Sequence, residues 1–257
     1  MNRLSFTPEH GKTCYQQQLE HDLLQVREFE QYRWFHFNEV DIQSIVDTTQ
    51  PCRIVLPVYQ SMLIFLLWKK APLDILNLGM GGGTFERFFS TLPHVNVTSV
   101  EQSQPIISMA KNYFYLPDNA HVINQSAELF LQETPLKNNF DIVLIDIYSN
   151  EAMPPAIFTK SFYADLHKRM RKEGVAVINL IIKEGQVIID LLRTIRDYFN
   201  CCVFLEFTDY SNMILLISNI EIPAQDILFT QSKQGDNIAG VDFEKTIKTI
   251  HYLPVKQ

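Results

Sequence analysis

Four of the nine glycines in the chain fall within five positions, at Gly79 and at 81–83. A short apolar run over 75–78 precedes them, and phenylalanines at helical spacing follow them. A strand, a glycine turn and a helix in this order bring a nucleotide-like ligand against bare backbone. Glycine suits such a turn because it adopts positive φ easily and its missing Cβ lets a ligand approach. The Gly-x-Gly-x-x-Gly spacing is not met, since Thr84 stands where the last glycine would fall. A plain tight turn is therefore the alternative.

Glu101 ends the next apolar run, about 20 residues beyond the glycines, which is where dinucleotide-binding folds hold a ribose diol. Its two carboxylate oxygens match two adjacent hydroxyls. The alternative is an acid that stabilises the N-terminus of a helix over 105–114. Both roles can coexist in one residue.

Asp146 ends the most apolar predicted strand, over 140–147. Ligands in open α/β sheets bind at the carboxyl ends of the strands, so this carboxylate is expected to border a cleft. There it would act as a general base or bind a cationic substrate. The alternative is an aspartate that caps a loop or a helix start.

Composition narrows the class of protein. The 257 residues suit one large domain, or one domain with a small appendage, and 46% apolar residues allow a substantial core. The net charge of -7 argues against nucleic acid as a partner. The four cysteines form no Cys-x-x-Cys pair, which argues against a zinc site or a disulfide framework and favours the reducing cytoplasm. The most apolar stretch, 54–68, is too short and interrupted to span a membrane.

The order of predicted elements indicates an α/β fold. Residues 23–47 alternate like short strands and predict a small antiparallel sheet, followed by a helix over 58–70. From Asp74 onward, strands alternate with helices, which predicts a parallel sheet covered on both faces. The expected strands are 75–78, 96–100, 120–123, 140–147 and 174–182, with a closing antiparallel pair at 201–207 and 213–218. Further helices are expected at 105–114, 159–171, 185–199 and 243–251.

From residue 23 to residue 218 the chain resembles the spermidine synthase family of polyamine aminopropyltransferases. The resemblance implies a Rossmann-like, class I S-adenosylmethionine-dependent methyltransferase fold over 57–257, preceded by a small antiparallel β-domain over 1–56. It implies decarboxylated S-adenosylmethionine or S-adenosylmethionine as co-substrate, without a metal. It also implies a small amine such as putrescine as acceptor and a dimer or tetramer as the assembly, of which a homodimer is the expectation here. The charge and hydropathy given above predict no nucleic-acid or membrane partner.

The resemblance assigns a role to each matching residue. Asp146 would accept the amine proton, with help from Tyr59. Residues expected to bind the nucleoside co-substrate are Gln43, Gly79, Gly81, Gly82, Thr84, Glu101 and Gln125. Residues expected to face the amine are Tyr59, Gln60 and Tyr210.

The chain departs from the family pattern at three places. Thr84 and Phe85 replace the Asp-Gly that ends the family loop, Gln125 replaces the aspartate that touches adenine, and Ser149 replaces a second aspartate after Asp146. Gln125 can still accept a hydrogen bond through its amide oxygen. An aspartate is the natural partner of the ammonium in the decarboxylated donor, so Thr84 weakens aminopropyl transfer relative to methyl transfer.

Two other functions therefore stay open. One is a methyltransferase on the same fold, which would use ordinary S-adenosylmethionine. The other is a non-catalytic binder of a nucleoside or polyamine. Glu151 could supply negative charge to a polycation in any of these cases.

Overall fold

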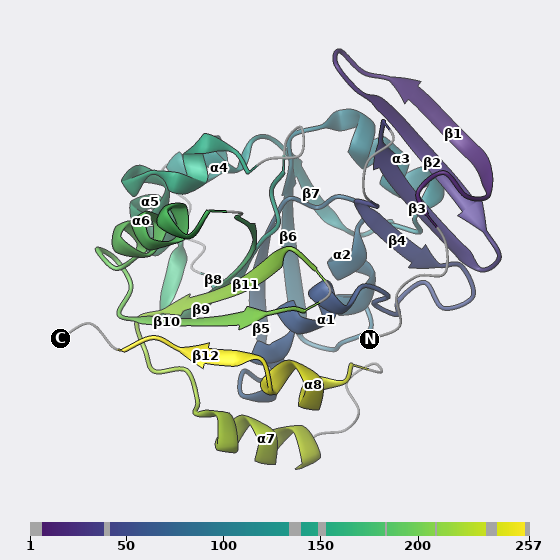
Figure 1. Cartoon of the computed structure of the whole chain (residues 1–257). Helices are drawn as coiled ribbons and strands as arrows, with labels where there is room; N and C mark the ends of the chain where they lie inside the picture. The colour runs from purple at the N-terminus through teal and green to yellow at the C-terminus, as the bar shows by residue number, and fades with distance from the viewer. Residues whose placement is uncertain are drawn as a thin grey trace.

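The computed structural model describes residues 7–38, 42–133, 140–148, 153–182, 184–208, 210–234 and 241–254. They form a small antiparallel sheet beside a large mixed sheet that carries helices on both faces (Figure 1). The predicted α/β class with an N-terminal β-domain is confirmed. Within these residues, no helix is both long and apolar enough to cross a membrane.

The small sheet is a meander whose strand order follows the chain: β1 (Lys12–Gln18), β2 (Leu23–Phe29), β3 (Tyr32–Phe37) and β4 (Ser44–Asp47). The last three strands were predicted from their alternation. The sequence of β1, Lys-Thr-Cys-Tyr-Gln-Gln-Gln, is mostly polar and partly exposed, so no hydrophobic pattern marks it. Backbone pairing with β2 holds it in place. The division into 1–56 and 57–257 stays a prediction.

The large sheet has the order β12-β10-β11-β9-β8-β5-β6-β7. Strands β5, β6, β7, β8 and β9 pair in parallel, while β10, β11 and β12 extend the sheet in antiparallel fashion. The bounds are β5 (Leu73–Leu78), β6 (Val95–Glu101), β7 (His121–Asn124), β8 (Phe140–Ile145), β9 (Met170–Ile181), β10 (Cys201–Glu206), β11 (Asn212–Ser218) and β12 (Ile250–Tyr252). Strand β8 is nearly all apolar because helices cover both of its faces.

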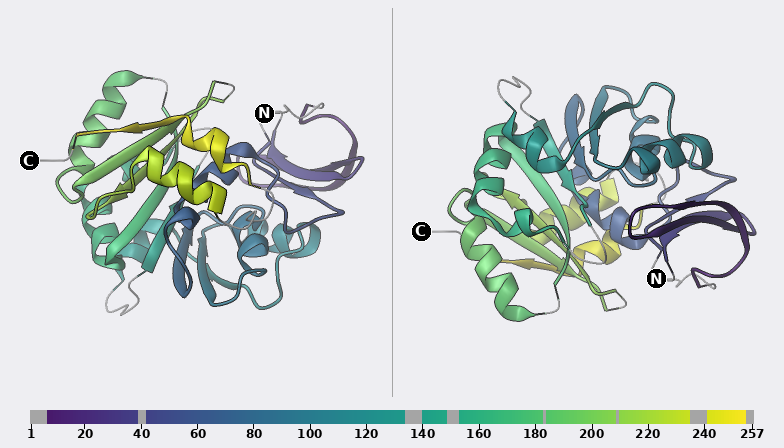
Figure 2. Two further views of the ribbon diagram at one scale, coloured as in Figure 1. Left: turned by 90° about the horizontal axis from the view of Figure 1, so that it is seen from below. Right: turned by 90° about the horizontal axis from the view of Figure 1, so that it is seen from above.

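Helices cover both faces of this sheet (Figure 2), and a hydrophobic core lies on each face. One is built from α1 (Pro57–Met62), η1 (Ile64–Leu67), α2 (Thr84–Phe89), α7 (Gln225–Gln234) and α8 (Phe243–Ile247). The other is built from α4 (Ala127–Gln132), η2 (Pro155–Phe158), α5 (Lys160–Arg169) and α6 (Gly185–Ile195). Helix α3 (Gln104–Tyr113) packs against the small sheet, with which it shares a core.

Three predicted helices were wrong in part. The helix expected over 185–199 ends earlier, at Ile195. The helix expected over 58–70 ends at Met62 and continues as the 3₁₀ turn η1, so its last turns are tightened rather than α-helical. The helix expected over 243–251 ends at Ile247, and the following residues become β12 because Ile250 pairs with Leu205 of β10. In the last two cases tertiary packing overrides local propensity.

Candidate active site

The glycine loop lies between β5 and α2, at the carboxyl edge of the sheet. Gly79, Gly81 and Gly83 all have positive φ, of 89°, 53° and 72°. A Cβ on Gly79 would collide with the backbone carbonyl of Asp146, whereas a Cβ on Gly81 would meet nothing within 4 Å. Gly79 thus allows the two strand ends to touch, and Gly81 leaves space open beside the backbone.

Backbone hydrogen bonds tie the ends of neighbouring strands together. The Gly79 N–H donates to the Val100 carbonyl at 2.9 Å, and the Asp146 N–H donates to the Leu78 carbonyl at 2.9 Å. The ladder therefore continues past the last residues of β5 and β8. It places the glycine loop, the end of β6 and Asp146 next to one another, as the order of strands predicted.

Glu101 lies against the glycine loop. Its Oε2 accepts a hydrogen bond from the Gly81 N–H at 3.3 Å, and its Oε1 accepts one from the Ser103 N–H at 2.9 Å. Burial raises the pKa of this carboxyl, although the backbone donors oppose the shift. Each oxygen keeps acceptor capacity, so the pair can still receive two hydroxyls.

Asp146 is half-buried and bonded from a neighbouring strand. Its Oδ1 accepts a hydrogen bond from Nδ2 of Asn179 on β9, at 2.8 Å. Burial raises the pKa of Asp146, opposed by hydrogen bonds from Asn179 and from the Tyr59 hydroxyl. A carboxylate with a raised pKa is better matched to taking a proton near neutral pH than an exposed aspartate.

Tyr59 connects Asp146 to the small sheet. Its hydroxyl donates to the backbone carbonyl of Gln43 at 3.0 Å and also lies within hydrogen-bonding range of Asp146. One hydroxyl proton can serve only one of these acceptors at a time. Burial, followed by the charge of Asp146, raises the pKa of Tyr59 well above its ordinary value, so the phenol stays protonated.

Thr84, the first residue of α2, is buried at 6% exposure. Its hydroxyl lies 3.2 Å from Oγ of Ser44 and accepts a hydrogen bond from Arg87 at 3.4 Å. Beside it, a Cβ on Gly82 would come within 2.5 Å of the Ser44 hydroxyl. The small sheet therefore closes over this end of the glycine loop.

Arg87 and Glu86 are two buried charged residues of α2 that lie next to the glycine loop. Neither was predicted as a site residue. The Arg87 guanidinium donates to the carbonyls of Pro51, Gly82 and Phe114. Burial lowers the pKa of Arg87 to about 10, so it stays charged at neutral pH. Glu86 accepts hydrogen bonds from two buried polar side chains, Asn77 and Ser99. Both residues look like ordinary surface charges of a helix in the sequence.

Three further predicted residues make side-chain contacts outside this cluster, although the Gln125 backbone N–H donates to the Glu101 carbonyl at 3.2 Å. The Gln60 amide donates to the Ile54 carbonyl at 2.8 Å, and the Gln125 amide donates to Glu133 at 2.5 Å. Tyr210 packs edge-on against Phe207, with ring centroids 6.1 Å apart. The roles given to these side chains stay predictions. Ser149 and Glu151 lie outside the described residues.

Two asparagines that sequence reasoning missed complete the site. Asn179 contacts Asp146, and Asn212, the first residue of β11, donates to Oδ1 of Asn179 at 2.9 Å. One signal was available in the sequence. Asn179 interrupts the apolar run 175–181 close to the carboxyl end of β9, where a buried polar side chain needs a partner.

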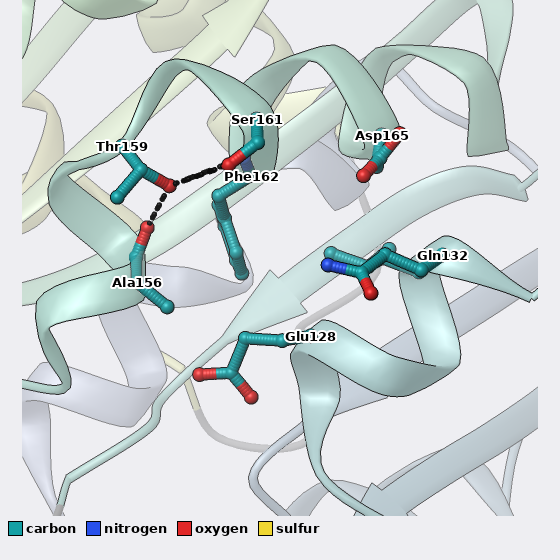
Figure 3. Close-up of a pocket in the computed structure, with 8 residues that line it drawn as sticks. Glu128, Gln132, Ala156, Thr159, Ser161, Phe162 and Asp165 are labelled. Atoms are coloured by element: carbon teal, nitrogen blue, oxygen red, sulfur yellow. Dashed lines mark hydrogen bonds between the residues drawn. The ribbon is translucent and has the colours of Figure 1, made fainter.

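A separate cavity of about 160 Å³ lies between α4 and α5 (Figure 3). Its polar lining comes from Glu128, Gln132, Thr159, Ser161 and Asp165. The Thr159 hydroxyl is engaged with the Ala156 carbonyl at 2.7 Å and the Ser161 hydroxyl at 3.1 Å. None of the predicted site residues lines this cavity. Across the described ranges, no group of three or more His, Cys, Asp or Glu side chains is placed to hold a metal.

Comparison with known proteins was made by sequence and by structure. No protein-family model matches the chain. The polyamine aminopropyltransferase of Chromobacterium violaceum is 28% identical over 151 residues, covering 57% of this chain and 57% of that protein. The N-terminal histidine N-methyltransferase of Emericella nidulans is 28% identical over 154 residues, covering 55% of this chain and 27% of that protein. The chain thus spans little more than half the length of the aminopropyltransferase that it matches.

Solved structures support the same fold. A probable spermidine synthase from Corynebacterium glutamicum superposes with a TM-score of 0.73 at 16% identity, over 95% of this chain and 90% of that chain. A spermidine synthase bound to the transition-state analogue AdoDATO gives a TM-score of 0.64 at 17% identity, over 84% of this chain and 75% of that chain. Human methyltransferase-like protein 13 in complex with SAH also gives 0.64, at 18% identity, over 76% of this chain and 93% of that chain. These likenesses establish the Rossmann-like methyltransferase fold.

Proposed function

We propose that this chain, a divergent spermidine synthase-like protein, transfers an aminopropyl group from decarboxylated S-adenosylmethionine to a polyamine acceptor such as putrescine. The observation that carries the proposal is the contact between Gly79 and the backbone of Asp146. It supports the proposal because the Asp146 carboxyl, whose pKa burial raises, follows a backbone that touches the same glycine loop to which Glu101 is bonded. The sequence similarity to polyamine aminopropyltransferases supports the same reaction.

In the proposed reaction the nucleoside is held first. Glu101 receives the ribose hydroxyls while the loop residues Gly79, Gly81 and Gly82 lie against the nucleoside. Gln125 accepts from the adenine amine. Since Gly81 faces open space, a ligand can approach its backbone without a steric penalty.

The acceptor amine then attacks the carbon next to the sulfonium sulfur. A carbon–nitrogen bond forms, the carbon–sulfur bond breaks, and the sulfur keeps the electron pair as the thioether of methylthioadenosine. Only a neutral amine carries a lone pair, so a proton must first pass to Asp146. Tyr59, Gln60 and Tyr210 orient the amine, and much of the rate comes from this alignment.

One observation favours methyl transfer as a second candidate. The donor ammonium of the decarboxylated nucleoside needs a carboxylate, yet residues 79–89 contain one acid, Glu86, which is turned toward Asn77 and Ser99. Thr84 and Gln43, which are also expected to contact the donor, carry no charge either. Ordinary S-adenosylmethionine carries its own carboxylate and does not need that partner.

A product screen by mass spectrometry tests both candidates. Each donor would be offered separately with putrescine, spermidine and cadaverine, and the amine would be analysed for an added aminopropyl or methyl group. An added aminopropyl group from the decarboxylated donor supports the proposal. Methylated amine from the ordinary donor favours the second candidate, and nucleoside binding without any product points to a non-catalytic binder.

We further propose a homodimer in the reducing cytoplasm, acting on a small amine without a metal. All four cysteines lie within the described residues and are free. Free thiols fit a reducing compartment. Size-exclusion chromatography with light scattering would test the dimer.

A further inference from the structure

Asn179 is a buried amide aimed at the proposed base. It lies on β9 at 4% exposure, and its Nδ2 donates to Oδ1 of Asp146 at 2.8 Å. Its Oδ1 accepts from Nδ2 of Asn212 at 2.9 Å. Three side chains from β9, β11 and the end of β8 therefore form one directed chain of hydrogen bonds.

Asp146 and Asn212 together fix which way the Asn179 amide faces. An asparagine side chain has one acceptor oxygen and one donor NH₂ group. The ionised Asp146 carboxylate can only accept, so the NH₂ group must face it, and Asn212 matches this orientation by donating to the oxygen. The reversed amide would set its oxygen against the Asp146 carboxylate and an NH₂ group against another NH₂ group, losing both hydrogen bonds.

The backbone around Asn179 is fixed as well. The Tyr148 hydroxyl donates to the Asn179 carbonyl at 3.0 Å, from the segment that follows Asp146. On the other side, Asn179 pairs with Ile214 in the antiparallel register of β9 and β11. Its amide thus points from a rigid strand rather than from a loop.

We propose that Asn179 is a positioning residue for Asp146, and that Asn212 helps to set its orientation. The Asn179 amide occupies Oδ1 and keeps it as an acceptor. Oδ2 takes the amine proton while the Tyr59 hydroxyl donates to the Gln43 carbonyl rather than to Asp146. This inference rests on the proposed function, because it assigns to Asp146 the part of a base.

The titratable groups that face Asp146 allow the electrostatic effect of a substitution at position 179 to be isolated. The titratable side chains that act on it among the described residues are Tyr59 of α1 and Tyr148 of its own segment. Burial raises the pKa of both phenols, so both stay neutral in the working pH range. A new charge at position 179 would therefore be the dominant electrostatic change at Asp146.

Two substitutions and one matched control test the proposal. Asn179→Asp keeps the shape of the side chain but sets a second carboxylate against Asp146, which is expected to move the acid limb of kcat/KM upward by about one pH unit. Asn212→Asp does not touch Asp146. Its carboxylate accepts hydrogen bonds only, so it competes with Asp146 for the NH₂ group of Asn179 and is expected to shift the limb in the same direction by less.

The control is Asn96→Asp. Asn96 donates to Asp74 at 3.0 Å, so it makes the same kind of contact at the opposite edge of the same sheet. It is exposed and far from the site, and its variant is expected to keep the wild-type pH profile. Urea unfolding would verify that all three variants fold.

A second readout separates this inference from the proposed function. The carboxyl of Asp146 would be titrated by carbon-13 NMR, with its signal assigned by comparison with Asp146→Asn. If no amine is turned over, the proposed function fails, but an upward-shifted titration in Asn179→Asp and Asn212→Asp still supports the positioning role. If both variants fold and the Asp146 titration stays at its wild-type pH, the positioning role is overturned whatever the activity.

Discussion

Replacing Glu101 by glutamine tests the nucleoside half of the site. The substitution keeps the size of the side chain and removes its charge. In the structure the two carboxylate oxygens accept from the N–H groups of Ser103, at 2.9 Å, and Gly81, at 3.3 Å. A glutamine has one acceptor oxygen, so one of these N–H groups would face an NH₂ group instead.

The expected loss follows from the hydrogen bonds removed. A hydrogen bond to a charged group contributes about 1.5–3 kcal/mol, against about 1 kcal/mol between neutral groups. Exchanging two charged ribose contacts at Glu101 for one neutral contact therefore costs about 3 kcal/mol. That free energy corresponds to roughly a 150-fold rise in Kd at room temperature.

Isothermal titration calorimetry with methylthioadenosine would measure this loss. The ligand carries the ribose and adenine but no amine or carboxylate tail, so the result does not depend on which donor the chain uses. Glu206→Gln is the matched control, because Glu206 is likewise the last residue of its strand. Five strand spacings separate β10 from β6, which is about 24 Å.

Two results would refute the reasoning about Glu101. A folded Glu101→Gln variant with wild-type affinity would mean that the carboxylate holds no ribose. An equal loss of affinity in Glu206→Gln would mean that only the net charge of the protein matters.

Three further predictions separate chemistry from folding. Asp146→Asn cannot take a proton, so turnover is expected to fall about 10²–10⁴-fold at unchanged methylthioadenosine affinity; undiminished turnover by the folded variant would disprove the base. Gly79→Ala is expected to cost about 3 kcal/mol of stability in urea unfolding, because its Cβ strikes backbone, whereas Gly81→Ala costs about 1 kcal/mol and chiefly weakens nucleoside binding. Burial raises the pKa of Glu86, so the native chain binds that proton more tightly than the unfolded chain, and stability falls as pH rises from about 4.5 through the folded pKa. Glu86→Gln is therefore expected to lose less stability than wild type between about pH 4.5 and pH 8, and an unchanged slope would argue against this.

The fold and the centre of the site could be predicted because they depend on local patterns. A continuous apolar strand such as β8 marks a buried parallel strand, and the carboxyl ends of such strands meet at one edge. That rule alone predicts that the glycine loop, Glu101 and Asp146 lie together. The contact between Gly79 and Asp146 gives the physical reason why a glycine begins the loop.

The two asparagines that were not predicted depend on the long-range register of the strands. Asn179 and Asn212 are 33 residues apart and meet only because β9 and β11 pair in one particular antiparallel register. No periodicity carries that information. Arg87 was missed for a different reason, since a buried arginine that donates to three carbonyls has the same sequence signature as a solvated helix charge.

The small sheet is part of the site rather than an addition to it. Phe35 of β3 packs edge-on against Phe114, with ring centroids 5.8 Å apart, and both belong to the core shared with α3. Because α3 begins just after Glu101, this packing also supports the segment that carries Glu101. From the same sheet, Ser44 meets Thr84 and the Gln43 carbonyl meets Tyr59. The donor tail and the acceptor amine would thus both lie where the two sheets meet, so a change of donor or acceptor preference requires changes in both.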